Sequence, residues 1–153
     1  MIKAIDTSYK GYKFRSRLEA RWAIYFDAIG LEWEYEKEGF EFEDGKRYLP
    51  DFYIPDFGYI EIKGKKPNEE EKEKAKKLSL GKNCGVTILV GTPNPEGNCF
   101  ICFIEGLETC KTNFSKYSVR KWGQTPYYGD YNYYNLEDIE SINKAKSARF
   151  EFN

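Results

Sequence analysis

Three residues with ionisable side chains lie in two neighbouring apolar runs. Asp51 follows a proline at the start of the first run, and Glu61 and Lys63 lie ten and twelve residues further along, in the second. Because side chains alternate faces along a β-strand, Glu61 and Lys63 should project from the same face. If the two runs pair as a hairpin, Asp51 can lie beside Glu61. The spacing therefore predicts two carboxylates and one ammonium group at a single place.

Such a group of residues suits metal-assisted chemistry on a phosphate. Carboxylate oxygens are hard ligands of the kind that bind Mg²⁺ or Mn²⁺, and a nearby lysine can serve a phosphate or orient a water. The 153-residue chain contains no histidine, which excludes Ser-His-Asp triads and His-containing zinc sites. Catalysis would have to rely on carboxylates, Lys, Tyr, Cys or a metal ion.

Each of these residues also has a purely structural interpretation. Glu61 and Lys63 could form an ordinary solvated strand face. Their neighbours Tyr59, Ile60 and Ile62 favour a central strand instead, where a buried charge must be paired or bound to metal.

The sequence Pro-Asp-Phe occurs twice, so Asp51 competes with Asp56 for the site. The second copy continues into Gly58, and aspartates in such turns commonly bond their own backbone. Asp51 begins the strand that would pair with Glu61. We therefore predict Asp51 for the site and a structural role for Asp56.

The segment 48–64 resembles the signature of the PD-(D/E)xK nuclease superfamily, with Asp51, Glu61 and Lys63 at the three signature positions. The segment 14–22 resembles the first helix of phage-encoded members, which carries a further active-site glutamate, here Glu19. The order of the four residues is similar to that in phage junction-resolving endonucleases of the endonuclease I type. The tail 145–151 resembles that of small phage nucleases, and the resemblance is clearest over about residues 9–66.

The resemblance implies an α/β (α+β) fold with a restriction-endonuclease-like core, in which a central mixed β-sheet is flanked by helices. Residues 1–153 would form a single nuclease domain, with 111–153 a tyrosine-rich extension that ends in a helix. The implied activity is that of a Mg²⁺- or Mn²⁺-dependent endodeoxyribonuclease. The implied catalytic residues are Glu19, Asp51, Glu61 and Lys63, and the implied metal ligands are Asp51, Glu61, the carbonyl of Ile62 and Glu19.

Glu19 has a second interpretation, because it stands three residues after Ser16 and fits a helix-capping box. The net charge of −1 excludes a globally basic DNA-binding protein, yet a local basic face remains possible. The expected phosphate contacts are Arg15, Arg17, Arg21, Lys65 and Lys66. A mixed-charge soluble surface explains any single one of them equally well.

The resemblance favours branched DNA, such as a Holliday junction formed in DNA recombination, and a homodimer that cuts two strands. Alternatives are a sequence-specific or nicking restriction-type endonuclease, a non-catalytic DNA-binding or packaging module, and a tyrosine-rich carbohydrate or protein interaction domain. The tyrosines of 127–134 could stack on DNA bases or pack as a flap. No organic cofactor is expected.

Periodicity and turn residues predict the order of elements. Helices are expected over 16–29, from 68 to about 81 and over 136–149, and strands over 31–35, 40–42, 48–54, 59–63, 86–90 and 99–104, with a turn at 44–45 and irregular structure over 111–135. This order suits a mixed sheet with helices on both faces.

The sequence lacks an apolar run long enough for a membrane span and a signal-peptide stretch, so we expect a cytoplasmic protein, in the host cytoplasm if it is phage-encoded. The four cysteines, Cys84, Cys99, Cys102 and Cys110, should then be reduced. One CxxC pair inside an apolar strand is a weak signal for zinc.

Overall fold

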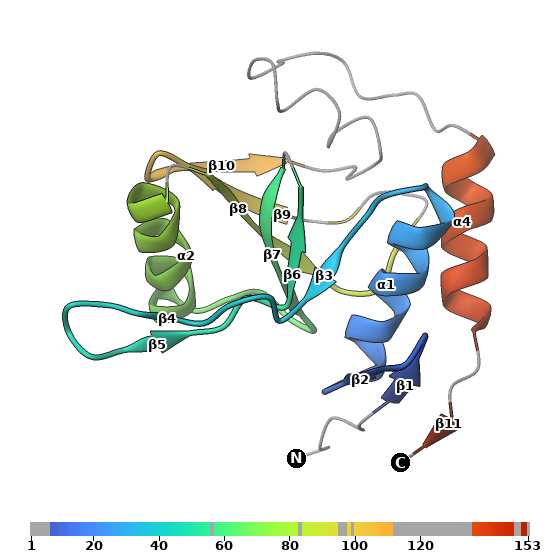
Figure 1. Cartoon of the computed structure of the whole chain (residues 1–153). Coiled ribbons are helices and arrows are strands. Elements are labelled where there is room, and N and C mark those ends of the chain that lie inside the picture. The colour runs from blue at the N-terminus through green and yellow to red at the C-terminus, as the bar shows by residue number, and fades with distance from the viewer. Residues whose placement is uncertain are drawn as a thin grey trace.

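The computed structural model describes residues 7–55, 57–82, 84–94, 98, 100–111, 136–148 and 151–152. These residues form a mixed α+β fold in which a central mixed sheet is accompanied by the helices α1, α2 and α4 (Figure 1). Within the described ranges, no helix combines the length and the apolar character needed to cross a bilayer.

The central sheet has the strand order β10-β9-β8-β7-β6-β3. Its strands are β3 (Glu34–Tyr35), β6 (Phe52–Ile54), β7 (Gly58–Lys63), β8 (Gly85–Val90), β9 (Phe100–Ile104) and β10 (Leu107–Lys111). Only β7 and β8 pair in parallel among these neighbours. A parallel pair needs a crossover, and α2 (Glu69–Lys82) supplies it. The predicted strand over 86–90 is confirmed as β8, and its residues 86–89 are buried.

Side-chain alternation divides the core into two layers, one on each face of the sheet. Phe52, Ile60, Ile62 and Leu89 pack with residues of α1 (Arg17–Ala28) in one cluster. The other cluster contains Ala75 and Leu78 of α2. It also contains the strand residues whose positions alternate with those of the first cluster: Tyr59, Val86, Ile88, Ile101 and Phe103. Helices α1 and α2 therefore cover opposite faces of the sheet (Figure 1). Glu61 lies two residues after Tyr59 on the same strand, so its side chain is on the face that α2 covers.

The predicted first helix is confirmed as α1, with Ser16 as its N-cap and Gly30 in a positive-φ conformation after its end. Helix α4 (Leu136–Ser147) confirms the predicted last helix and lies beside α1 (Figure 1). Trp22 on α1 is buried, and its indole Nε1 donates a 2.8 Å hydrogen bond to the carbonyl of Gly91 after β8. This bond ties the helix to the end of the sheet next to Lys63.

Two small sheets were not fully expected. One has the order β11-β1-β2 and joins β1 (Thr7–Tyr9), β2 (Tyr12–Phe14) and β11 (Glu151–Phe152). The other pairs β4 (Phe40–Glu41) with β5 (Arg47–Tyr48) through the predicted turn, in which Gly45 has φ 81°.

Two predicted elements need correction. The strand expected over 48–54 is divided into β5 and β6, because Pro50 between them has no N–H to donate to a ladder. Lys111, expected to open an irregular region over 111–135, belongs to β10, and residues 112–135 lie outside the described residues. Asp56, Cys99, the side chain of Cys110 and the tyrosines of 127–134 lie outside the described residues. Cys102 is fully buried in the core.

Candidate active site

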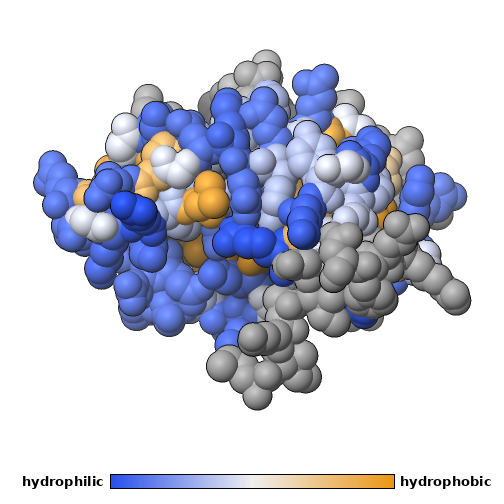
Figure 2. Space-filling model, turned by 60° about the horizontal axis from the view of Figure 1, so that its bottom comes forward, coloured by the Kyte–Doolittle hydropathy of each residue, from blue (hydrophilic) through white to orange (hydrophobic). Residues whose placement is uncertain are grey.

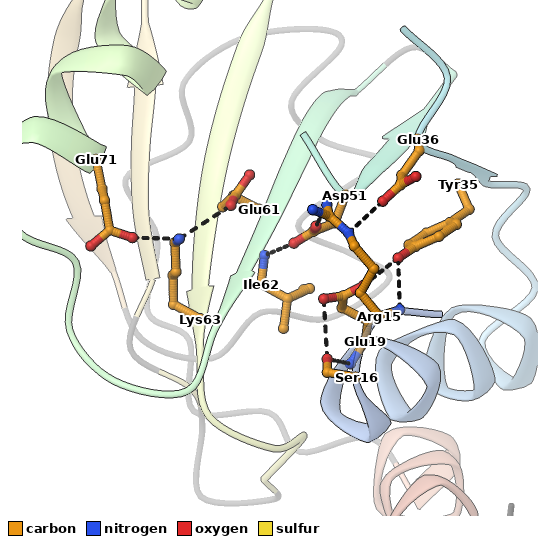
Figure 3. A network of polar contacts seen from close by, with 10 residues as sticks. All are labelled: Arg15, Ser16, Glu19, Tyr35, Glu36, Asp51, Glu61, Ile62, Lys63 and Glu71. Carbon is orange, nitrogen blue, oxygen red and sulfur yellow. Dashed lines mark hydrogen bonds and ion pairs between the residues drawn. The ribbon is translucent and has the colours of Figure 1, made fainter. Parts of the chain in front are cut away.

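Strands β6 and β7 bring Asp51 next to the strand residue Glu61, as the sequence predicts. Asp51 directly precedes β6, and its Oδ2 accepts a 2.7 Å hydrogen bond from the backbone N–H of Ile62 in β7. The Asp51 side chain is 4% exposed and that of Glu61 is 14% exposed. Figure 3 shows these groups at the centre of a polar network that extends from α2 to the N-terminus of α1.

The two carboxylates hold their protons more tightly than free carboxylates do. Burial raises the pKa of Asp51 well above 3.8, and the nearby charges of Glu61 and Glu19 raise it further. The Ile62 hydrogen bond and Arg15 act in the opposite direction. Burial also raises the pKa of Glu61, against the effect of Lys63. Full charge on both carboxylates is therefore costly unless a cation lies beside them.

Lys63 lies between two carboxylates. Its Nζ is 3.4 Å from Glu61 Oε1 and forms a closer ion pair with Oε2 of Glu71 in α2. Burial alone would lower the pKa of Lys63, but the contacts with Glu71 and Glu61 raise it above 10.5. Glu71 is held in turn by Asn68, since the Glu71 N–H donates to Asn68 Oδ1 at 2.8 Å and the Asn68 N–H donates to Glu71 Oε1 at 3.1 Å.

Arg15 lies on the other side of the carboxylate pair. Its Nη2 donates to Asp51 Oδ1 at 3.3 Å, and its Nε lies 2.6 Å from Glu36 Oε1 in an ion pair that lacks the direction of a hydrogen bond. The Arg15 side chain is 57% exposed, so the guanidinium bounds the site on its solvent side.

Glu19 caps α1, and its carboxylate also lies near Asp51. Its N–H donates to the N-cap Ser16 at 3.1 Å, as capping requires. Its carboxylate accepts hydrogen bonds from the hydroxyls of Ser16 and Tyr35, and its charge contributes to the raised pKa of Asp51. The half-buried phenol of Tyr35 has a raised pKa because of burial and the bond to Glu19. Glu19 is thus fixed at the end of α1 within electrostatic range of Asp51.

Several residues of this network were missed in the sequence. Tyr48 is 9% exposed, and burial and the charge of Glu61 raise the pKa of its phenol. Neither Tyr48 Oη nor the buried Glu61 Oε2 makes a hydrogen bond of normal geometry, so the site retains unsatisfied polar atoms. No sequence pattern indicated that Glu36 or Tyr35 belongs to this network. The Asn68-x-x-Glu71 spacing, which is that of a capping box, could have indicated Glu71.

The basic residues expected to bind DNA lie in different surroundings. Lys65 and Lys66 are exposed and lie two and three residues after the end of β7, and Arg17 is the first residue of α1. Arg21 donates from Nη1 to the carbonyls of Ala145 and Lys146 at 2.8 and 2.7 Å, which fastens the end of α4 to α1. The structure therefore gives Arg21 a structural task.

Hydrophilic residues predominate on the side of the molecule that lies at the bottom of Figure 1, as Figure 2 shows, and the hydrophobic areas visible there are small and separate. Exposed Leu49 is adjacent to the Pro50-Asp51 step. A polar face of this kind is compatible with a charged ligand.

The donor set suits a small divalent ion. Among the described residues, no three His, Cys, Asp or Glu side chains are grouped closely enough to enclose a metal. Mg²⁺ typically uses only one or two protein carboxylates, with waters and substrate phosphates as its other ligands. Asp51, Glu61 with its unpaired buried oxygen, and the Ile62 carbonyl fit that requirement.

No protein-family model, curated protein or solved structure matches this chain.

Proposed function

We propose that this protein is a metal-dependent DNA endonuclease of the PD-(D/E)xK type, with Asp51, Glu61, Lys63 and Glu19 as its catalytic residues. The observation that carries the proposal is the buried carboxylate pair formed by Asp51 and Glu61. Burial holds the pKa of both groups above their ordinary values. A protein maintains such a pair at a cost in stability, and perturbed groups of this kind are concentrated in functional sites.

The arrangement of elements supports a restriction-endonuclease-like core. A helix precedes the sheet, β6 and β7 form an antiparallel pair that carries the signature residues, and α2 crosses over to the parallel strand β8. Further support is that Asp51 directly precedes β6, Glu61 and Lys63 lie in the second half of β7, and Glu19 lies in the first turn of α1.

Asp51, Glu61 and the Ile62 carbonyl would hold Mg²⁺ or Mn²⁺, with Glu19 contributing its charge from the end of α1. When bound, the ion would supply Lewis acidity toward the phosphate and a more acidic water. The Lys63 ammonium would neutralise charge that develops on the phosphate oxygens during in-line hydrolysis of the phosphodiester. The exposed guanidinium of Arg15 could bind an adjacent phosphate in a two-point contact.

The proposed substrate is branched DNA, such as a four-way junction, cut by a homodimer in which each chain acts on one strand. This choice rests on the resemblance of residues 9–66 to junction-resolving endonucleases. Exposed Lys65 and Lys66 after β7 would extend the contact along the DNA backbone.

The test is cleavage of end-labelled four-way junction, nicked duplex, linear duplex and single-stranded DNA with Mg²⁺, Mn²⁺ or EDTA. Glu61→Gln removes the charge and keeps the shape of the side chain. Glu34→Gln is the matched control, because Glu34 is exposed on β3 and pairs only at 3.7 Å with Lys37 in the described structure.

Metal-dependent cleavage that is lost in Glu61→Gln and kept in Glu34→Gln would support the nuclease, and the preferred substrate would separate a junction-resolving enzyme from a restriction-type enzyme. Tight binding without cleavage would indicate a DNA-binding module. Absence of both would refute the proposal.

A further inference from the structure

Each carboxylate of the buried pair faces a cation that is also bound by a second, outer carboxylate. Arg15 lies between Asp51 and Glu36, and Lys63 lies between Glu61 and Glu71 (Figure 3). The two arrangements come from different parts of the chain, the β3 and α2 regions, and they flank the same central pair.

Both cations lie closer to the outer carboxylate than to the inner one. Arg15 is 2.6 Å from Glu36 and 3.3 Å from Asp51. Lys63 is 3.4 Å from Glu61 and closer to Glu71. The inner carboxylates are therefore only partly neutralised, and each cation has a partner that it can keep if the inner carboxylate takes another ligand.

Both outer residues are anchored by contacts other than the cations, Glu71 through its carboxylate and Glu36 through its backbone. Glu71 is locked at the start of α2 by its two reciprocal hydrogen bonds with Asn68. Glu36 has φ 48°, an uncommon conformation for a residue other than glycine, and its N–H donates a 2.8 Å hydrogen bond to the carbonyl of Asp51. Strained backbone of this type is concentrated at functional sites.

We propose that Glu36 and Glu71 are positioning residues that retain Arg15 and Lys63 at the edge of the site when a divalent cation binds Asp51 and Glu61. This inference rests on the proposed function. Without its outer partner, each basic side chain would pair fully with the inner carboxylate and compete with the ion. With its outer partner present, each basic side chain stays beside the bound ion, where it would contact a phosphate of the substrate.

Direct Mn²⁺ binding to the full-length protein tests this proposal without any cleavage assay. Titration calorimetry would compare wild type with Glu71→Gln and Glu36→Gln. Glutamine preserves the acceptor that Asn68 needs, so the capping box is kept. The dissociation constant should rise about three- to ten-fold in each variant, the range expected for a partly buried charge pair. The control Glu69→Gln removes a charge from the same helix turn as Glu71, and the control Glu34→Gln removes one from the same strand region as Glu36. Each control should change the dissociation constant by less than about two-fold.

A second measurement separates positioning from a general loss of negative charge. In a Lys63→Met background, Glu71→Gln should no longer weaken Mn²⁺ binding, because the competing cation is gone. The proposal would be overturned if Glu71→Gln weakened Mn²⁺ binding equally in that background. It would also be overturned if Glu71→Gln and Glu36→Gln bound Mn²⁺ as tightly as their controls. In either case normal wild-type binding would leave the proposed nuclease site intact. A wild-type protein that binds no Mn²⁺ would refute both the proposed function and this inference.

Discussion

The backbone N–H of Ile62 donates a 2.7 Å hydrogen bond to Oδ2 of Asp51. This bond joins the residue before β6 to the residue that follows Glu61 in β7. It orients the Asp51 carboxylate through the main chain, so the orientation does not depend on a bound cation. Strand pairing thus brings the two inner carboxylates together, and the basic side chains of Arg15 and Lys63 flank them.

Asp51→Asn should abolish metal-dependent cleavage while the protein remains folded. Asparagine keeps an oxygen that can accept the Ile62 N–H but loses the charge that would hold the ion. We expect a rate at least about 10²-fold lower, the size seen when one electrostatic group is removed from an active site. Cleavage assays and circular dichroism of the same preparation would check this. A folded variant that cuts at the wild-type rate would exclude Asp51 from catalysis.

The contribution of Asp51 and Glu61 to the stability of the metal-free protein should increase as the pH is lowered from neutrality toward their ordinary pKa values of 3.8 and 4.5. The pKa of Asp51 and of Glu61 is raised on folding, so the folded state binds protons more tightly than the unfolded state. Their contribution is fully present below the ordinary values of 3.8 and 4.5 and is lost as the pH rises through the folded values. Urea unfolding in EDTA at several pH values would measure this.

The control for this pH effect is the double variant Asp51→Asn/Glu61→Gln, which cannot titrate at these positions. Its free energy of unfolding should depend less on pH over the same range and exceed that of wild type at pH 7. Equal pH dependence in both proteins would show that the two carboxyls are not the source.

Arg21→Ala should lower the free energy of unfolding of the protein and have a smaller effect on its affinity for DNA. The Arg21 guanidinium binds the carbonyls of Ala145 and Lys146, and hydrogen bonds to a charged group are worth about 1.5–3 kcal/mol. Urea unfolding should show a loss of that size. The salt dependence of DNA binding should stay as in wild type.

Lys65→Ala/Lys66→Ala should show the opposite behaviour. Both lysines are exposed after β7, so stability should change little. The slope of log affinity against log salt concentration should fall by about one for each lysine that contacts a phosphate. Binding measured between low and moderate salt decides the point, and an unchanged slope would remove these lysines from the DNA interface.

Gly58→Ala should destabilise the sheet that carries Glu61 and Lys63. Gly58 has φ 127°, and a Cβ there would lie 2.1 Å from the carbonyl oxygen of Gly85 in β8. Backbone strain and overpacking together should cost about 2–6 kcal/mol. Gly64→Ala is the control, because a Cβ at Gly64 would meet no atom within 4 Å in the described structure. Thermal unfolding of both variants would test this, and equal midpoints would contradict the close approach.

Local features of the sequence were sufficient to predict much of the framework. Helical spacing between Ser16 and Gly30 defines α1, alternation defines the two faces of β7, and the continuous apolar run 86–90 defines β8. These features depend on contacts within a few residues, so periodicity and capping residues record them. The same alternation indicated that Glu61 and Lys63 share a face.

Only the tertiary structure decided how the charges are partnered. The pairing of Lys63 with Glu71, of Arg15 with Glu36 and Asp51, and of Arg21 with the end of α4 joins separate elements. The division of the 48–54 run and the addition of β10 likewise depend on neighbouring strands. A charged residue has the same local pattern whether it meets solvent, a carbonyl or a carboxylate. Its partner and its burial are fixed only when distant segments pack together.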